Sequence, residues 1–151
     1  MGSTSREQLI ARALENAPDI VEIADSECRL QYVNRAFEEL TGYSQEEVIG
    51  RTRNDILRSD SHDDAFYEEI ARVVSSGAVW AGPMTSCTKD GQLFTQEVCV
   101  APVRDESGAI TNYVSVGRAL GERKVGDRVR LDVLRKGGPV TLEALLERAS
   151  A

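Results

Sequence analysis

The sequence predicts an α+β domain in which helices cover one face of a five-stranded antiparallel sheet, preceded by an N-terminal amphipathic helix. Three observations predict this class. Two short apolar runs lie near the start, several helices marked by capping and ending residues follow, and three strand-like runs joined by tight turns come last. Helices on one face of such a sheet would leave a cavity between the helices and the sheet.

The first element is a helix predicted over residues 5–17, because Ser5 and Gln8 match a capping box and Pro18 ends the segment. We assign residues 1–18 to this N-terminal part. Its apolar side chains form one stripe that can pair two copies of the chain, and the alternative is that the helix folds back onto its own sheet. The candidate interface residues are Leu9, Ile10, Ala13 and Leu14.

The next elements are short. The apolar runs 19–24 and 29–33 predict a hairpin. Two helices are expected at residues 34–42 and 44–50, since each range opens with a capping residue and closes with a glycine. Residues 51–61 are polar without periodicity, and they predict an irregular connection.

A longer helix and three strands complete the domain, which we place at residues 19–120. The helix is expected over residues 63–76, where apolar side chains recur at helical spacing. Strand-like runs at 79–88 and 92–103 flank an Asp-Gly dipeptide, which is a strong hairpin signal. A second turn leads into the last strand, at 109–120.

Residues 121–151 have a different character and are assigned to a C-terminal extension or linker. Residues 128–133 alternate like a strand, although the same segment fits a continued helix equally well. Thr141 is expected to begin a further helix, whose apolar residues are Leu142, Leu145 and Leu146.

Composition excludes several classes of function. The net charge of −7 and the dispersed basic residues argue against nucleic acid as a partner. No apolar run is long enough to span a membrane, no signal peptide opens the chain, and the three cysteines form no CxxC motif, so we expect a cytoplasmic protein with reduced thiols. The single histidine excludes a multi-histidine zinc site. No residue is predicted to be catalytic, and no metal ligand set is predicted.

Four stretches carry a family resemblance. Residues 32–43 have the sequence YVNRAFEELTGY and residues 44–51 the sequence SQEEVIGR. A Trp-Ala-Gly tripeptide at 80–82 precedes Lys-Asp-Gly at 89–91, and residues 101–108 have the sequence APVRDESG. Together these stretches resemble the PAS domain, a sensory module common in bacterial signalling proteins, and in particular its subgroup with a WxG…KDG motif.

This resemblance implies a non-catalytic sensory and dimerisation module in a bacterial signal-transduction protein. Such a module passes a conformational bias, induced by a ligand or partner, to an output domain such as a kinase or cyclase. The implied partners are a second copy of the chain, an output or partner signalling domain, and a small apolar ligand. The candidate pocket residues are Phe37, Leu40, Leu57, Phe66, Ile70, Trp80, Met84, Val98 and Val114.

The resemblance implies no particular cofactor, and flavin and haem are the two alternatives. The subgroup resembles PAS domains that hold FAD. By this resemblance Trp80 would stack on the ring system of a flavin (FAD or FMN). Ser86, however, stands where those domains have an asparagine, and a serine offers fewer hydrogen bonds to the flavin. Light-oxygen-voltage photochemistry needs a cysteine at the position that Arg53 holds here. His62 resembles the haem ligand of oxygen-sensing members, which makes haem the second alternative.

Overall fold

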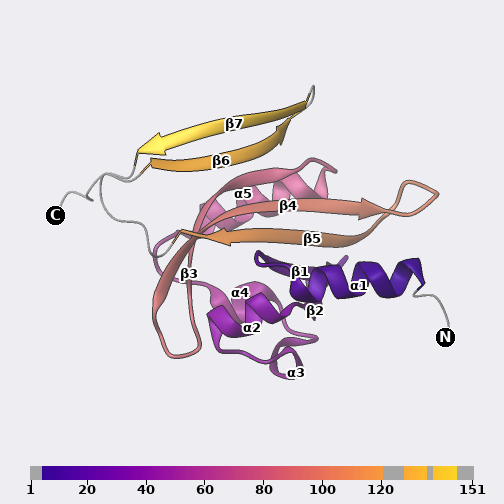
Figure 1. The fold of residues 1–151 in the computed structure, drawn as a ribbon, viewed down its shortest axis with the longest axis horizontal. Helices are drawn as coiled ribbons and strands as arrows, with labels where there is room; N and C mark the ends of the chain where they lie inside the picture. The colour runs from indigo at the N-terminus through magenta and orange to yellow at the C-terminus, as the bar shows by residue number, and fades with distance from the viewer. Residues whose placement is uncertain (1–4, 121–127, 136–137, 146–151) are drawn as a thin grey trace. The chain divides into compact units, whose positions relative to one another are not determined.

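The computed structural model describes residues 5–120, 128–135 and 138–145 (Figure 1). The chain divides into two compact units, Met1–Leu120 and Gly121–Ala151. The first unit holds a five-stranded sheet and its helices, and the second holds a two-stranded sheet.

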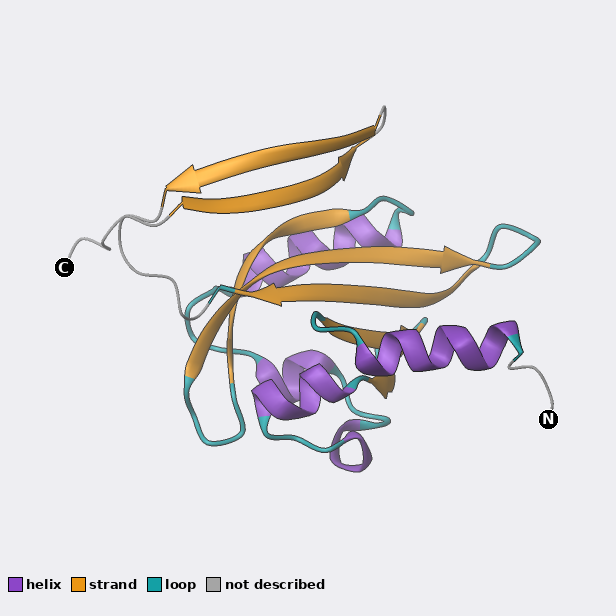
Figure 2. Cartoon of the chain, viewed as in Figure 1, coloured by secondary structure: helices purple, strands orange, loops and turns teal. Residues whose placement is uncertain are grey.

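All neighbouring strands of the five-stranded sheet are antiparallel (Figure 2). In space the first strand of the chain pairs with the last strand of the sheet, because the order is β2-β1-β5-β4-β3. This sheet confirms the α+β prediction with five antiparallel strands. The strands are β1 (Ile20–Asp25), β2 (Leu30–Val33), β3 (Trp80–Cys87), β4 (Leu93–Arg104) and β5 (Ile110–Ala119).

The helices of the first unit are α1 (Arg6–Asn16), α2 (Arg35–Thr41), α3 (Gln45–Val48), α4 (Arg53–Leu57) and α5 (Asp64–Ser75). Each begins after a side chain that accepts a hydrogen bond from the backbone N–H group three residues further on. Helix α2 contacts β1, α4 contacts β3, and α5 contacts both β3 and β4. Among the residues that the structure describes, no helix has the length and apolar character needed to cross a membrane.

Helix α4 corrects the prediction of an irregular connection over residues 51–61. Thr52 accepts a hydrogen bond from the backbone N–H group of Asp55 at 3.3 Å, which caps the helix. A helix this short has no room for apolar periodicity, and its two buried side chains, Ile56 and Leu57, lie next to each other in the sequence.

The main core cluster lies where α2, α3 and α4 meet β1 and β2. Phe37 of α2 is fully buried and Leu57 of α4 is nearly so. The other members of the cluster are Ile20, Leu30, Val33, Val48 and Ile56. This packing fixes the helices that carry the polar part of the site onto the first two strands.

The two faces of the sheet differ in burial. Met84 and Ser86 of β3 and Gln96 and Val98 of β4 are buried on the face that the helices cover. Cys99, next in sequence to Val98, is exposed on the opposite face. On these two strands the inner face therefore carries the buried polar side chains of Ser86 and Gln96 among apolar ones.

The second unit contains β6 (Arg128–Arg135) and β7 (Gly138–Leu145), which pair in antiparallel register. The strand reading of residues 128–133 is therefore right, and the helix expected to begin at Thr141 is wrong. A helix of so few residues has little stability of its own, whereas the two strands of a hairpin form hydrogen bonds with each other's backbone groups. Leu146 lies outside the described residues.

Candidate ligand-binding cavity

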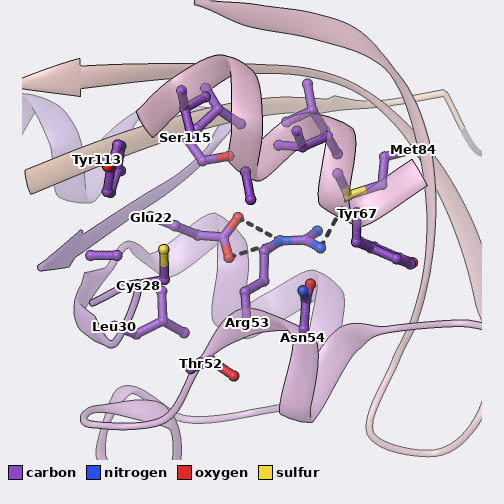
Figure 3. Close-up of a pocket in the computed structure, with 16 residues that line it drawn as sticks. Glu22, Cys28, Leu30, Thr52, Arg53, Asn54, Tyr67, Met84, Tyr113 and Ser115 are labelled. Carbon is purple, nitrogen blue, oxygen red and sulfur yellow. Dashed lines mark hydrogen bonds and ion pairs between the residues drawn. The ribbon is translucent and has the colours of Figure 1, made fainter. Parts of the chain in front are cut away.

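A cavity of about 160 Å³ lies between the inner face of the sheet and helices α4 and α5 (Figure 3). Most of its wall is apolar and comes from α5 and from alternate residues of the strands. The apolar wall residues include Leu30, Ile70, Val74, Met84, Val98 and Val100.

An ion pair lies in this apolar cavity. Nε of Arg53, at the start of α4, lies 3.1 Å from Oε1 of Glu22 and 3.2 Å from its Oε2. The side chain of Arg53 is 17% exposed and that of Glu22 is 5% exposed. Burial removes both charges from water, and the close contact compensates for much of that loss. Figure 3 shows the Glu22 carboxylate and the Arg53 guanidinium pointing toward each other across the cavity.

Both Nη atoms of Arg53 also contact acceptors. Its Nη2 donates to Oγ of Ser86 at 3.1 Å and to Oε1 of Gln96 at 3.4 Å. Its Nη1 lies 3.1 Å from Sδ of Met84, which is a weak acceptor. Arg53 thus connects β1, β3 and β4 through one side chain.

One oxygen of the ion pair has no hydrogen-bond donor. Oε1 of Glu22 is buried and accepts no hydrogen bond from any described residue, because Nε of Arg53 donates to Oε2. The hydroxyl of Tyr67 is also buried without a partner, but Figure 3 shows the Tyr67 ring extending away from the ion pair. The open acceptor at the ion pair is therefore Oε1 of Glu22.

The structure divides the predicted pocket residues into two sets. Ile70, Met84 and Val98 line the cavity. Phe37 and Leu57 lie in the main core cluster, away from the cavity wall.

Four further candidates lie elsewhere as well. Leu40 packs against the core cluster. Val114 points to the opposite face of β5, since its neighbours Tyr113 and Ser115 line the cavity. The rings of Phe66 and Trp80 contact each other edge to face, with centroids 5.8 Å apart, and neither residue lines the cavity.

The two residues that dominate the site, Glu22 and Arg53, were not predicted as site residues from the sequence. Glu22 had a detectable signal, because it is a charged residue inside the apolar run of β1. The only signal at Arg53 was that it holds the position at which light-oxygen-voltage domains need a cysteine. Their contact joins residues 31 positions apart, which no local pattern encodes.

The residues present do not fit a flavin. A cavity of about 160 Å³ is close to the ~150 Å³ that holds a single benzene ring, whereas drug-sized ligands need roughly 300 Å³ or more. The buried guanidinium of Arg53 also stands where the photochemical cysteine would be needed. A three-ring flavin would have to displace the ion pair.

The residues do not fit haem either. His62 does not line the cavity, and its ring stacks on Phe66 with centroids 3.8 Å apart. Its Nε2 accepts a hydrogen bond from the backbone N–H group of Thr85 at 2.9 Å, so this nitrogen has no free lone pair for iron. Within the described part of the chain, no group of three or more His, Cys, Asp or Glu residues is placed to hold a metal ion.

Helix α1 presents most of its apolar stripe to solvent. Leu9 is 62% exposed and Ile10 is 51% exposed. Ala13 is exposed and Leu14 is half-buried. The helix is held at its C-terminal end, where the hydroxyl of Tyr32 donates to Oε2 of Glu15 at 2.8 Å. Burial and this hydrogen bond raise the pKa of Tyr32 to about 12.

The comparison with known families agrees with this architecture. The model of the PAS fold matches residues 8–120. This chain belongs to the PAS family. The PAS domain thus includes most of α1 and the whole five-stranded sheet, together with every residue that lines the cavity.

The chain spans a third or less of the curated relatives that it matches, which are much longer proteins. The bacterioopsin transcriptional activator of Halobacterium salinarum is 28% identical over 97% of this chain, which spans 21% of that protein. An RNA-binding light-oxygen-voltage receptor is 28% identical with a TM-score of 0.73, over 81% of this chain and 35% of the receptor. A light-oxygen-voltage domain studied with a flavin analogue is 26% identical with a TM-score of 0.67, over 76% of this chain and 86% of that domain.

Proposed function

We propose that this PAS domain is a non-catalytic sensory and dimerisation module of a bacterial signal-transduction protein. It passes a ligand- or partner-induced conformational bias to an output domain, and it works in the cytoplasm. The observation that carries this proposal is the cavity, which holds a polar contact inside an apolar wall. Such a combination suits recognition of a small molecule.

The cavity is connected to α1 through the backbone of β1. Glu22 lies next to Val21, whose N–H group donates to Oδ1 of Asn34 at 3.1 Å. Nδ2 of Asn34 in turn donates to the carbonyl oxygen of Leu14 in α1 at 2.9 Å. A ligand that moves Glu22 would therefore act on a strand that is bonded to α1. This route supports signal transmission from the cavity to the helix.

The relatives support a signalling context. They include a transcriptional activator and a light-oxygen-voltage receptor, and a blue-light-activated histidine kinase from Erythrobacter litoralis is 28% identical over 72% of this chain. The free state of all three cysteines supports a reducing compartment.

Dimerisation through α1 is the first test of this proposal. We expect the chain to be a dimer in solution. Leu9→Glu combined with Ile10→Glu should make it a monomer, since two charges would enter the exposed apolar stripe that the dimer would bury. Glutamate is a good helix former, so α1 itself should persist. Size-exclusion chromatography with multi-angle light scattering measures the mass of each form.

The matched control uses two equally exposed apolar residues outside α1. Leu93 is 63% exposed and Val79 is 56% exposed, compared with 62% for Leu9 and 51% for Ile10. Leu93→Glu combined with Val79→Glu should leave the dimer intact. A wild-type chain that is monomeric at all concentrations would contradict the proposal, and so would a dimer that survives the α1 substitutions.

Flavin remains the second candidate because a solved neighbour is a light-oxygen-voltage domain studied with a flavin analogue. The size of the cavity and the buried Arg53–Glu22 pair argue against it. We therefore expect protein purified without added cofactor, and protein incubated with FMN or FAD, to show no bound flavin absorption in the near-ultraviolet and blue. A bound flavin band after gel filtration would favour the flavin sensor instead.

A further inference from the structure

Glu22 is a buried carboxylate that is paired with Arg53 and faces the cavity, and only its Oε2 accepts a hydrogen bond from Arg53. Its side chain is 5% exposed, and Figure 3 shows its carboxylate pointing into the space enclosed by the lining residues. Oε1 accepts no hydrogen bond within the described residues. A buried carboxylate oxygen without a donor is unfavourable, and a bound molecule that donates to it would remove that penalty.

The charge of the site selects a neutral donor. Arg53 already balances the charge of Glu22, and its own donors contact Ser86, Gln96 and Met84. A ligand ammonium group beside Glu22 would also lie close to the Arg53 guanidinium and be repelled by it. A ligand carboxylate would lie close to the carboxylate of Glu22 and be repelled in the same way. A neutral hydroxyl or N–H group avoids both repulsions and still donates to Oε1.

The size and wall of the cavity select the rest of the molecule. Its volume of about 160 Å³ resembles that of an apolar cavity of about 150 Å³ that binds benzene. The apolar wall includes Ile70 and Val74 of α5, Val98 and Val100 of β4, and Leu30. The apolar wall favours an apolar ring, and the volume of the cavity leaves no room for a second fused ring.

We propose that the cavity binds a neutral single-ring aromatic molecule of the phenol class, whose hydroxyl group donates to Oε1 of Glu22. This inference rests on the proposed sensory function and deepens it by naming the ligand chemistry. The hydroxyl would complete the hydrogen bonding of the carboxylate, while the ring fills the space between α5 and β4. Cys28, Thr52 and Ser115 at the polar part of the wall would discriminate among ring substituents.

The test compares four single-ring probes, namely phenol, toluene, benzylamine and benzoate, by NMR titration of the isotope-labelled chain. Phenol and toluene differ by a hydroxyl and a methyl group, so their ratio isolates the hydrogen bond. A hydrogen bond to a charged group is expected to make phenol bind roughly tenfold more tightly than toluene. Benzylamine and benzoate should bind more weakly than toluene. Equal binding of phenol and toluene, or preferred binding of a charged probe, would overturn the inference.

Variants locate the site. Glu22→Gln should reduce the preference for phenol over toluene severalfold, whereas Glu97→Gln, which changes a carboxylate outside the cavity, should leave it unchanged. Val100→Phe should abolish binding of both probes by filling the cavity, and because Val100 is only half-buried this variant tests the site even if Glu22→Gln does not fold. Full binding by Val100→Phe would contradict the assignment.

The failure of this inference can be distinguished from the failure of the proposed function. If the chain is a dimer but binds none of the probes, this inference is wrong and the dimerisation part of the proposed function still stands.

Discussion

Replacing Arg53 with methionine should lower the free energy of unfolding by about 3–5 kcal/mol, because Glu22 would keep a buried charge without its counter-ion. The large effect follows from burial of both partners, with side chains 17% and 5% exposed. Urea denaturation followed by circular dichroism measures the change, and the slope of the transition shows whether unfolding remains two-state.

Two further variants make this prediction specific. Arg72→Met breaks an exposed ion pair between Arg72 and Glu69, whose side chains are 70% and 53% exposed, and should change the free energy of unfolding far less than Arg53→Met does, because water screens the pair. Arg53→Met combined with Glu22→Leu should recover most of the loss, since an apolar pair of similar volume avoids the desolvation penalty. If Arg53→Met is no more destabilising than Arg72→Met, the pair does not hold the cavity wall together.

The outcome also bears on function. If an apolar pair is as stable as the ion pair, stability alone gives no reason to keep two charges in this cavity. Ligand recognition would then be a physical role that accounts for both charges. The double variant should consequently lose the preference for phenol while it keeps the fold.

The order of helices and strands could be predicted because its signals are local. Caps such as Asn34 and Ser44, and the Asp-Gly turn before β4, each act within three or four residues of the chain. Helix α4 was missed because five residues are too few for periodicity to develop. The helix expected at Thr141 was wrong because capping alone does not decide between a short helix and a hairpin strand.

The cavity was harder to predict because an apolar pattern identifies burial and does not distinguish a packed core from the wall of a void. Phe37 and Leu57 satisfy the pattern and lie in the core, whereas Ile70 satisfies it and lines the cavity. Val114 shows a second limit, since the strand was predicted but the face its residues occupy depends on register with β1 and β4. Only the folded chain brings Arg53 to Glu22.

Replacing Asn34 with alanine should destabilise the domain by about 3 kcal/mol, because one fully buried side chain supplies four hydrogen bonds. Its Oδ1 accepts from the N–H groups of Val21 at 3.1 Å and Phe37 at 3.2 Å. Its Nδ2 donates to the carbonyl oxygens of Leu14 and Asp19, both at 2.9 Å. Alanine would remove all four hydrogen bonds, although the carbonyl oxygen of Leu14 would keep a second bond from the N–H group of Ala17 at 3.3 Å. Loss of a helix cap alone costs about 1 kcal/mol.

Ser44→Ala is the matched control, since Ser44 caps α3 through one hydrogen bond to the backbone of Glu47 at 3.3 Å and joins no other elements. It should destabilise the domain by about 1 kcal/mol at most. An equal effect of the two substitutions would show that Asn34 is only a cap.

Hydrogen exchange separates the capping role of Asn34 from its connecting role. Asn34→Ala should accelerate exchange at the amides of α1, because the bond to Leu14 holds the last turn of that helix to β1, while Ser44→Ala should leave α1 unchanged. If α1 is the dimer interface, the variant should also dimerise more weakly, although residue 34 lies outside the apolar stripe. Weaker dimerisation would mean that the strand carrying Glu22 and the helix carrying Leu9 share one structural connection, as a sensor of cavity occupancy requires. Unchanged α1 exchange and unchanged dimerisation would show that the cavity and the helix are independent.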